Sequence, residues 1–215
     1  MTRAVQDPSR RAGSIARRFL TLPSRFVAAR SGVAGVEFAL IAPLLVFLFI
    51  GCVEISHFAN NVRKVGYLAR AVGEVVSQAE TIDAREAQEV FQAAALIMPP
   101  FDGSTARIRL STIGTAVEDG PIQAKVCSAV ATANTQARQV GEDLTVLFPV
   151  EEKGSRFLYV EVEMPYKILF LGQILDRETG GDTFQVRNAL KWPVRKGVRK
   201  KSRYPEVVLP IGGPC

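Results

Sequence analysis

Residues 33–55 read VAGVEFALIAPLLVFLFIGCVEI, and this stretch decides how the rest of the chain is interpreted. Residues 38–53 carry no charged side chain, and Glu37 is the sole charge before them in the stretch. At a rise of roughly 1.5 Å per residue, such a helix covers about 34 Å, enough to cross the hydrocarbon core of a membrane. Pro43 predicts a kink, which a transmembrane helix can accommodate. We therefore expect a transmembrane helix over residues 33–56.

The basic charge of the chain lies before this segment. Residues 1–32 contain seven arginines and one acid, Asp7, which gives the same net charge of +6 as the whole chain has. Residues 33–215 are therefore neutral overall, and the case for nucleic-acid binding that the composition would otherwise suggest is removed. Basic flanks are typical of the cytoplasmic side of a membrane helix. We expect a cytoplasmic leader over residues 1–32, one pass through a bacterial inner membrane, and a periplasmic domain after it.

Three kinds of targeting segment other than a membrane anchor share features with this one. A cleaved secretory signal would need a small-x-small site after the apolar core, and none follows Ile55. A lipoprotein acylated at Cys52 would need a short motif ending in that cysteine, and residues 49–52 match it loosely. The arginine-rich, acid-poor leader also fits a mitochondrial transit peptide, but an organelle protein makes no use of the motif around Glu37.

Glu37 lies in an otherwise apolar segment, where an unpaired carboxylate is unfavourable and usually functional. Glu37 could simply rest at the cytoplasmic headgroup layer, but its neighbours favour a second explanation. Gly32 precedes four small or apolar residues, and Glu37-Phe38 then opens the run Ala39-Leu40-Ile41-Ala42-Pro43-Leu44-Leu45. This pattern resembles a type IV prepilin processing site. The run after Glu37 is similar to the TadE-like minor pseudopilins of tight-adherence (Flp-type) pilus systems.

The resemblance implies that a membrane prepilin peptidase cuts between Gly32 and Val33. Glu37 and Phe38 would then open the mature helix, and Glu37 would set the helix register by pairing with the Val33 amine of a neighbouring subunit. The implied partners are the prepilin peptidase, other pilins and pseudopilins, the inner-membrane pilus assembly platform and membrane lipid, with no nucleic acid. The implied function is assembly of tight-adherence pili, and hence surface adhesion and biofilm formation. The alternative is an uncleaved, membrane-anchored binding or scaffold protein of the envelope, with Glu37 merely interfacial.

The extracytoplasmic part changes from helical to strand periodicity. Apolar residues recur every three or four positions from Phe58 onward, which predicts an amphipathic periplasmic helix over residues 57–100. A break is expected near residues 81–83, where Thr81 or Asp83 could cap a second helix. Alternating patterns then predict strands near residues 106–113, 122–130, 156–168 and 183–194, within a β-rich domain over residues 101–215. The expected fold is α+β and pilin-like, with a long N-terminal helix packed on a roughly four-stranded antiparallel sheet.

In the predicted strand of residues 122–130, Ile122, Ala124, Val126, Ser128 and Val130 should share one face, with Cys127 on the other. Cys127 and Cys215 would both lie in an oxidising compartment and are candidates for a disulfide. The other possibility is two unrelated cysteines, one of them on a frayed tail. The tail itself, residues 205–215, is rich in turn-forming residues.

A basic run lies close to the end of the chain. Residues 195–203 contain six basic residues and no acid: Arg195, Lys196, Arg199, Lys200, Lys201 and Arg203. The run is interpreted either as a patch for an anionic partner or as a solvated loop. No catalytic, cofactor-binding or metal-binding pattern is found, and the single histidine, His57, excludes a histidine cluster. Glu54 and His57 are expected at the outer membrane–water interface. We therefore expect no enzyme, no cofactor and no metal.

Overall fold

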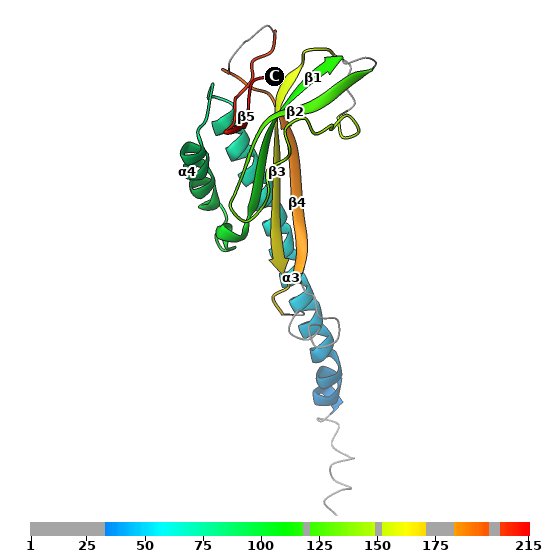
Figure 1. The fold of residues 1–215 in the computed structure, drawn as a ribbon. Coiled ribbons are helices and arrows are strands. Elements are labelled where there is room, and N and C mark those ends of the chain that lie inside the picture. Colours follow the sequence, from blue (N-terminus) through cyan, green and yellow to red (C-terminus); the bar gives the residue numbers. More distant parts are fainter. Residues whose placement is uncertain (1–32, 118–120, 149–151, 171–182, 198–202) are drawn as a thin grey trace, which may run out of the picture. The chain divides into compact units, whose positions relative to one another are not determined.

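The computed structural model describes residues 33–117, 121–148, 152–170, 183–197 and 203–215 (Figure 1). The chain forms two compact units, Met1–Val53 and Glu54–Cys215. The described part of the first unit is the beginning of helix α3 (Val33–Val76). Pro43 lies inside this helix and does not end it. The predicted leader, residues 1–32, lies outside the described residues, and the kink at Pro43 stays a prediction.

In the second unit, the remainder of α3 turns an apolar stripe toward the core. Its buried residues include Val65, Leu68, Ala69, Val72 and Val76, at the three- and four-residue spacing that places side chains on one face of a helix. Phe58 and Val62, which the sequence pattern assigned to the same stripe, are 42% and 40% exposed. The apolar part of the covered face of α3 thus begins near residue 65, and two buried polar residues, Glu54 and Asn61, precede it.

The helical part predicted over residues 57–100 divides near the expected place. Helix α3 ends at Val76, and helix α4 (Ala84–Ala95) follows. Asp83 is the N-cap of α4: its carboxylate accepts from the Glu86 N–H at 2.7 Å, and its own N–H donates to the Glu86 carboxylate at 2.9 Å. This reciprocal pair is a capping box, which satisfies N–H groups that the helix leaves without partners. Thr81, the other candidate cap, instead forms an isolated bridge with Val208.

In the described residues, five strands form one antiparallel sheet. They are β1 (Arg107–Val117), β2 (Ile122–Ala131), β3 (Arg156–Lys167), β4 (Thr183–Trp192) and β5 (Ile211–Gly212), preceded by a short 3-10 helix, η3 (Gly103–Thr105). The sheet order is β4-β3-β1-β2-β5. The predicted α+β fold is confirmed, and all four predicted strands are present. The short β5 strand lies in the tail, where the sequence predicted only turns.

The two faces of the sheet bury two different cores. One face packs against the helices, which lie along it in Figure 1, and joins Leu110 and Val160 to Leu68 and Phe91. The opposite face carries a smaller cluster around Ile113 and Phe157. There the connection between β2 and β3 supplies the cover, with Leu144, Ala137 and Phe148. Because β-strand side chains alternate, β1 and β3 contribute even-numbered residues to the first core and odd-numbered residues to the second.

The prediction that even-numbered residues of 122–130 share one face is wrong. Val126 belongs to the smaller core, and Val130 packs in the helix-covered core. The pairing of β2 with β1 shows the reason: Ser128 faces Thr112, whereas Val126 faces the next residue, Ile113. Cys127 is the extra residue of this β-bulge, and an extra residue in one strand exchanges the two faces from that point onward.

Candidate functional site

The first turns of α3 contain the residues that the sequence singled out for processing and register. Val33 is the first residue of the described helix, and Glu37 lies four positions later. Residues four apart in an α-helix lie on the same face, one turn from each other, so Glu37 and Val33 project from one side. Glu37 and Phe38 are exposed, Phe38 to 68%. Gly32 lies outside the described residues.

The apolar half of α3 is uncovered. Its large hydrophobic side chains at positions 33, 36, 38, 40, 41 and 44–49 are each more than half exposed. Helix α3 is long and apolar enough to cross a membrane. An exposed hydrophobic surface of this extent marks a membrane or protein interaction segment rather than a soluble helix.

The comparisons with known proteins point to this same segment. A family model described as TadE-like protein matches residues 32–73. Residues 32–73 are TadE-like. The resemblance expected from the motif is therefore confirmed over these residues. No curated protein and no solved structure matches the chain.

The TadE-like segment extends past the apolar run and includes a buried carboxylate. Glu54, one residue beyond the uncharged stretch, is only 8% exposed. Its oxygens accept the backbone N–H groups of Leu169 at 2.7 Å and Phe170 at 3.1 Å, and the hydroxyl of Tyr166 at 3.3 Å. Glu54 is therefore covered by protein and not open to solvent, and its expected level at the outer membrane–water interface stays a prediction. Residues that directly follow β3 cover it, and hydrogen bonds to a carboxylate compensate for its loss of hydration.

Tyr166, which donates to this carboxylate, lies in a cluster of aromatic rings. The Tyr166 oxygen lies 3.1 Å from Nδ1 of His57, and the His57 ring lies 4.6 Å from the Phe101 ring, centroid to centroid. Phe58 meets the Tyr166 ring edge-on at 5.2 Å. Burial, followed by the charge and hydrogen bond of Glu54, raises the pKa of Tyr166 to about 12, because a tyrosinate here would be poorly solvated and repelled by the carboxylate.

The TadE-like segment also packs closely against β4. Gly73, its last residue, faces Trp192, and a Cβ at this position would lie 3.1 Å from the indole ring. This contact is possible because glycine has no side chain. Helix α3 thus approaches the edge strand at the point where the family match ends.

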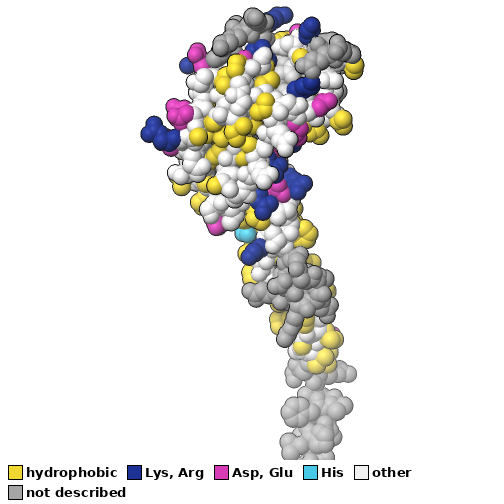
Figure 2. Space-filling view, in the orientation of Figure 1, with side chains coloured by type: hydrophobic (Ala, Val, Ile, Leu, Met, Phe, Trp, Pro, Cys, Tyr) yellow, Lys and Arg dark blue, Asp and Glu magenta, His cyan; other side chains and the backbone are white. Residues whose placement is uncertain are grey.

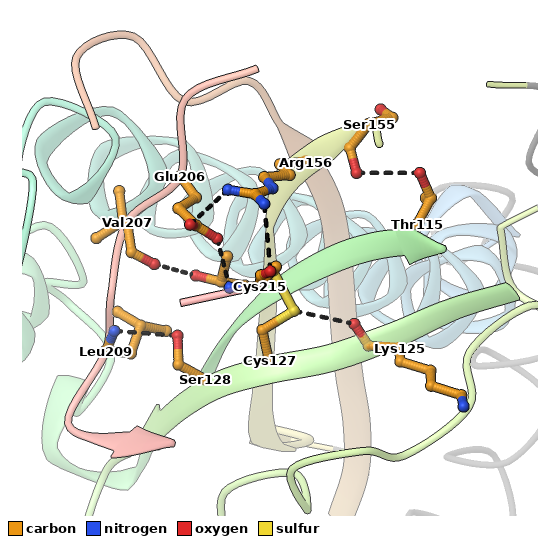
Figure 3. The surroundings of a disulfide bond; sticks show 11 residues. Thr115, Lys125, Cys127, Ser128, Ser155, Arg156, Glu206, Val207, Leu209 and Cys215 are labelled. Atoms are coloured by element: carbon orange, nitrogen blue, oxygen red, sulfur yellow. Dashed lines mark hydrogen bonds and ion pairs between the residues drawn. A yellow bond between two sulfur atoms is a disulfide. The ribbon is translucent and has the colours of Figure 1, made fainter. Parts of the chain in front are cut away.

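The structure contains the expected disulfide between Cys127 and Cys215 (Figure 3). The two Cα atoms are 5.2 Å apart, and the cysteines are separated by 88 positions in the sequence. The β-bulge described above contains Cys127, and Figure 3 shows the tail running back over β2 to reach it. Cys52, the third cysteine, is exposed in α3 and lies outside this disulfide.

The tail that carries Cys215 is part of the core. Val207 and Leu209 are 0% and 2% exposed. The Val207 carbonyl accepts from the Thr112 hydroxyl at 2.6 Å, and the Leu209 N–H donates to Ser128 Oγ at 3.0 Å. The tail is therefore held by packing and hydrogen bonds as well as by the disulfide. The sequence alternative of a cysteine on a frayed tail does not describe Cys215.

A buried ion pair lies beside the disulfide. Glu206 is fully buried, and its carboxylate receives Arg156 Nη1 at 2.5 Å and the Cys215 N–H at 2.7 Å. The second Arg156 nitrogen donates to the Cys215 carbonyl at 3.2 Å, so that one guanidinium and one carboxylate hold both sides of the same residue (Figure 3). No sequence pattern indicated this pair, since Glu206 and Arg156 are 50 positions apart and belong to no motif.

The basic run is partly paired with acidic groups. Of its six basic residues, Arg195, Lys196 and Arg203 lie in the described part, and Arg199, Lys200 and Lys201 lie outside it. Arg195 contacts the Glu74 carboxylate of α3 at 3.1 Å. Figure 2 shows basic and acidic side chains interspersed on the visible face of the domain, in keeping with the neutral charge after residue 32. Within the described residues, no group of three or more potential ligands could hold a metal ion.

Proposed function

We propose that this chain is a minor pseudopilin that supports the assembly of tight-adherence pili. In this proposal, it spans the bacterial inner membrane once, with residues 1–32 in the cytoplasm and the α+β domain in the periplasm. The observation that carries the proposal is the TadE-like match, which begins at Gly32, the residue before the expected cleavage point. Surface adhesion and biofilm formation would follow from the pili, and the role needs no catalysis, cofactor or metal from this chain.

The proposed mechanism begins with removal of the leader between Gly32 and Val33 by a prepilin peptidase. Cleavage would give the helix a cationic amine at Val33, four positions before Glu37. Since both groups lie on one face, the amine of one helix can meet the Glu37 carboxylate of an adjacent pilin or pseudopilin helix. In a low-dielectric environment this ion pair is strong enough to fix the helix register.

The exposed apolar surface of residues 33–53 supports this role. Inside the membrane it would contact lipid, and during assembly at the inner-membrane platform it would contact the helices of other subunits. Without a leader-processing step, the same features fit the alternative function, an uncleaved scaffold anchored in the envelope. Leader removal therefore separates the two functions.

The deciding experiment is N-terminal sequencing and intact-mass measurement of the chain from native membranes, with the prepilin peptidase present and then deleted. We expect a mature start at Val33 that requires the peptidase. Replacing Gly32 by leucine should retain the leader. Gly35→Ala is the matched control, because a Cβ at Gly35 meets nothing within 4 Å. A leader retained in wild-type membranes would support the anchored scaffold, and a start at Cys52 would indicate a lipoprotein.

A further inference from the structure

The residues that follow β3 present large apolar side chains beside Glu54. Leu169 is 42% exposed and Phe170 is 51% exposed. Their backbone N–H groups both bind the Glu54 carboxylate, at 2.7 and 3.1 Å. This bidentate contact fixes the main chain at the turn of α3 that carries Glu54. The hydrogen bonds to Glu54 thus hold the backbone from which the exposed side chains of Leu169 and Phe170 project.

The position of Glu54 in the sequence indicates how far the side chains of Leu169 and Phe170 lie from the end of the apolar run. Residue 53 is the last of the uncharged apolar run, and each helical residue adds roughly 1.5 Å, so Glu54 lies within one residue of the end of the span. Ile55 on the next helical position is 71% exposed, and Phe58 is 42% exposed. Leu169 and Phe170 therefore add to an apolar collar, defined here as Ile55, Phe58, Leu169 and Phe170.

Basic residues follow the collar along helix α3 and precede it at the end of β3. From Ile55 to Gly73, helix α3 carries Arg63, Lys64 and Arg70 and no acid, and Lys167 is exposed just before Leu169. Anionic lipid headgroups attract basic residues close to a membrane surface. An apolar collar followed by basic residues matches the order of the layers at a bilayer surface, where the hydrocarbon core is followed by anionic headgroups.

From these observations we propose that Leu169 and Phe170 insert into the outer leaflet of the membrane that α3 spans, so that the domain has a second membrane contact. The occupant of this surface is lipid, because Ile55 and Phe58 follow directly in the sequence on the uncharged apolar run that ends at residue 53. The inference rests on the proposed membrane insertion of residues 33–53, and it is independent of leader cleavage and pilus assembly. The Glu54 carboxylate holds the inserting residues and does not itself face lipid.

The test places a single tryptophan at the collar of the full chain. Trp192 is the sole tryptophan, so the Trp192→Phe background allows Phe170→Trp to report alone. The protein is reconstituted in vesicles of phosphatidylethanolamine and phosphatidylglycerol containing lipids brominated near the headgroup or deep in the acyl chain. We expect strong quenching of the emission of the introduced tryptophan, with the shallow bromines more effective than the deep ones. Leu169→Trp provides a second reporter should Phe170→Trp disturb folding.

Two control positions separate the possible results. Phe47→Trp reports the span itself, and Val146→Trp reports an exposed apolar position, 97% exposed, in the connection between β2 and β3. Quenching at 47 and at 170, with none at 146, supports the proposal. Quenching at 47 without quenching at 170 or 169 overturns it while leaving the membrane span intact. Absence of quenching at 47 overturns both the span and the second contact.

Discussion

Gly114 of β1 leaves open the space that the Sγ atom of Cys215 occupies. A Cβ built on Gly114 would lie 2.6 Å from that sulfur and 2.9 Å from the Sγ of Cys127. These separations are well below van der Waals contact, so a side chain at position 114 and the disulfide cannot share the same geometry. A glycine in the interior of a strand thus has a specific reason here, which is the close approach of a cystine.

Replacing Gly114 by alanine should hinder closure of the disulfide. We expect a larger fraction of reduced Cys127 and Cys215 in protein isolated from native membranes, because the added methyl group would clash with both sulfurs in their bonded positions. The fraction is measured by thiol labelling before and after reduction. Gly213→Ala is the matched control near the cystine, because a Cβ at Gly213 meets nothing within 4 Å. Equal labelling of both variants and the wild type would contradict the steric argument.

Removing the disulfide should destabilise the domain without unfolding it completely. For a loop closed by cysteines 88 positions apart, chain entropy gives a stabilisation of about 4–5 kcal/mol. We expect Cys215→Ser to lower the free energy of unfolding by up to this amount in detergent micelles. Val207 and Leu209 remain to hold the tail, so a cooperative transition should persist. Cys52→Ser, outside the disulfide, should leave the transition unchanged.

The ion pair between Arg156 and Glu206 predicts that substitutions of the two residues change the free energy of unfolding by amounts that do not add. Removing one partner leaves the other charge buried, which typically costs about 3–5 kcal/mol. Glu206→Leu should therefore destabilise the chain strongly, and adding Arg156→Met should recover part of the loss. Chemical denaturation of the two single variants and the double variant completes the cycle. Additive losses would show that the two residues act independently.

Local sequence patterns predicted the elements that depend on local physics. The uncharged run before Glu54, the alternation in residues 156–167 and the cap at Asp83 each act over a few residues, and the structure contains all three elements. The TadE-like motif is equally local, since its residues all fall between Gly32 and Leu45. Such features can be read from a single chain because no distant partner is needed to form them.

The missed features all depend on residues far apart in the sequence. Glu54 is buried only because residues more than a hundred positions later cover it, and Val207 enters the core only because the tail returns to β2. The bulge at Cys127 reverses the faces of one strand, which an alternating pattern cannot reveal. Turn-forming residues in the tail indicated neither the β5 strand nor the burial of Val207, because a turn-rich segment can still be buried when its polar groups find partners.

The environment of Tyr166 predicts a loss of stability in alkali. A pKa raised from 10 to about 12 means that the folded state keeps the phenolic proton where the unfolded state releases it. The stabilisation is therefore complete below pH 10 and is lost as the pH rises toward 12. Denaturant unfolding in detergent micelles should show Tyr166→Phe less stable than the wild type below pH 10, with the difference shrinking above it. A difference independent of pH would contradict the raised pKa of Tyr166.

Replacing Glu37 by alanine should prevent pilus assembly while leaving membrane insertion intact. Alanine removes the carboxylate that the proposed mechanism pairs with a neighbouring Val33 amine, and it makes the apolar segment more hydrophobic, so insertion should not suffer. We expect loss of surface pili by electron microscopy and a normal amount of chain in the membrane fraction. Peptidase-dependent removal of the leader is measured in the same strain.

Glu37→Asp is the informative companion, because it keeps the charge and shortens its reach by one methylene group. If the carboxylate acts through an ion pair, Glu37→Asp should retain part of the piliation that Glu37→Ala loses. Ala42→Leu, at a half-buried helical position without charge, controls for a general sensitivity of the segment to substitution. Normal piliation in Glu37→Ala would exclude a register role for Glu37 and would favour its simpler position at the headgroup layer. Loss of the chain from the membrane would instead assign Glu37 to insertion.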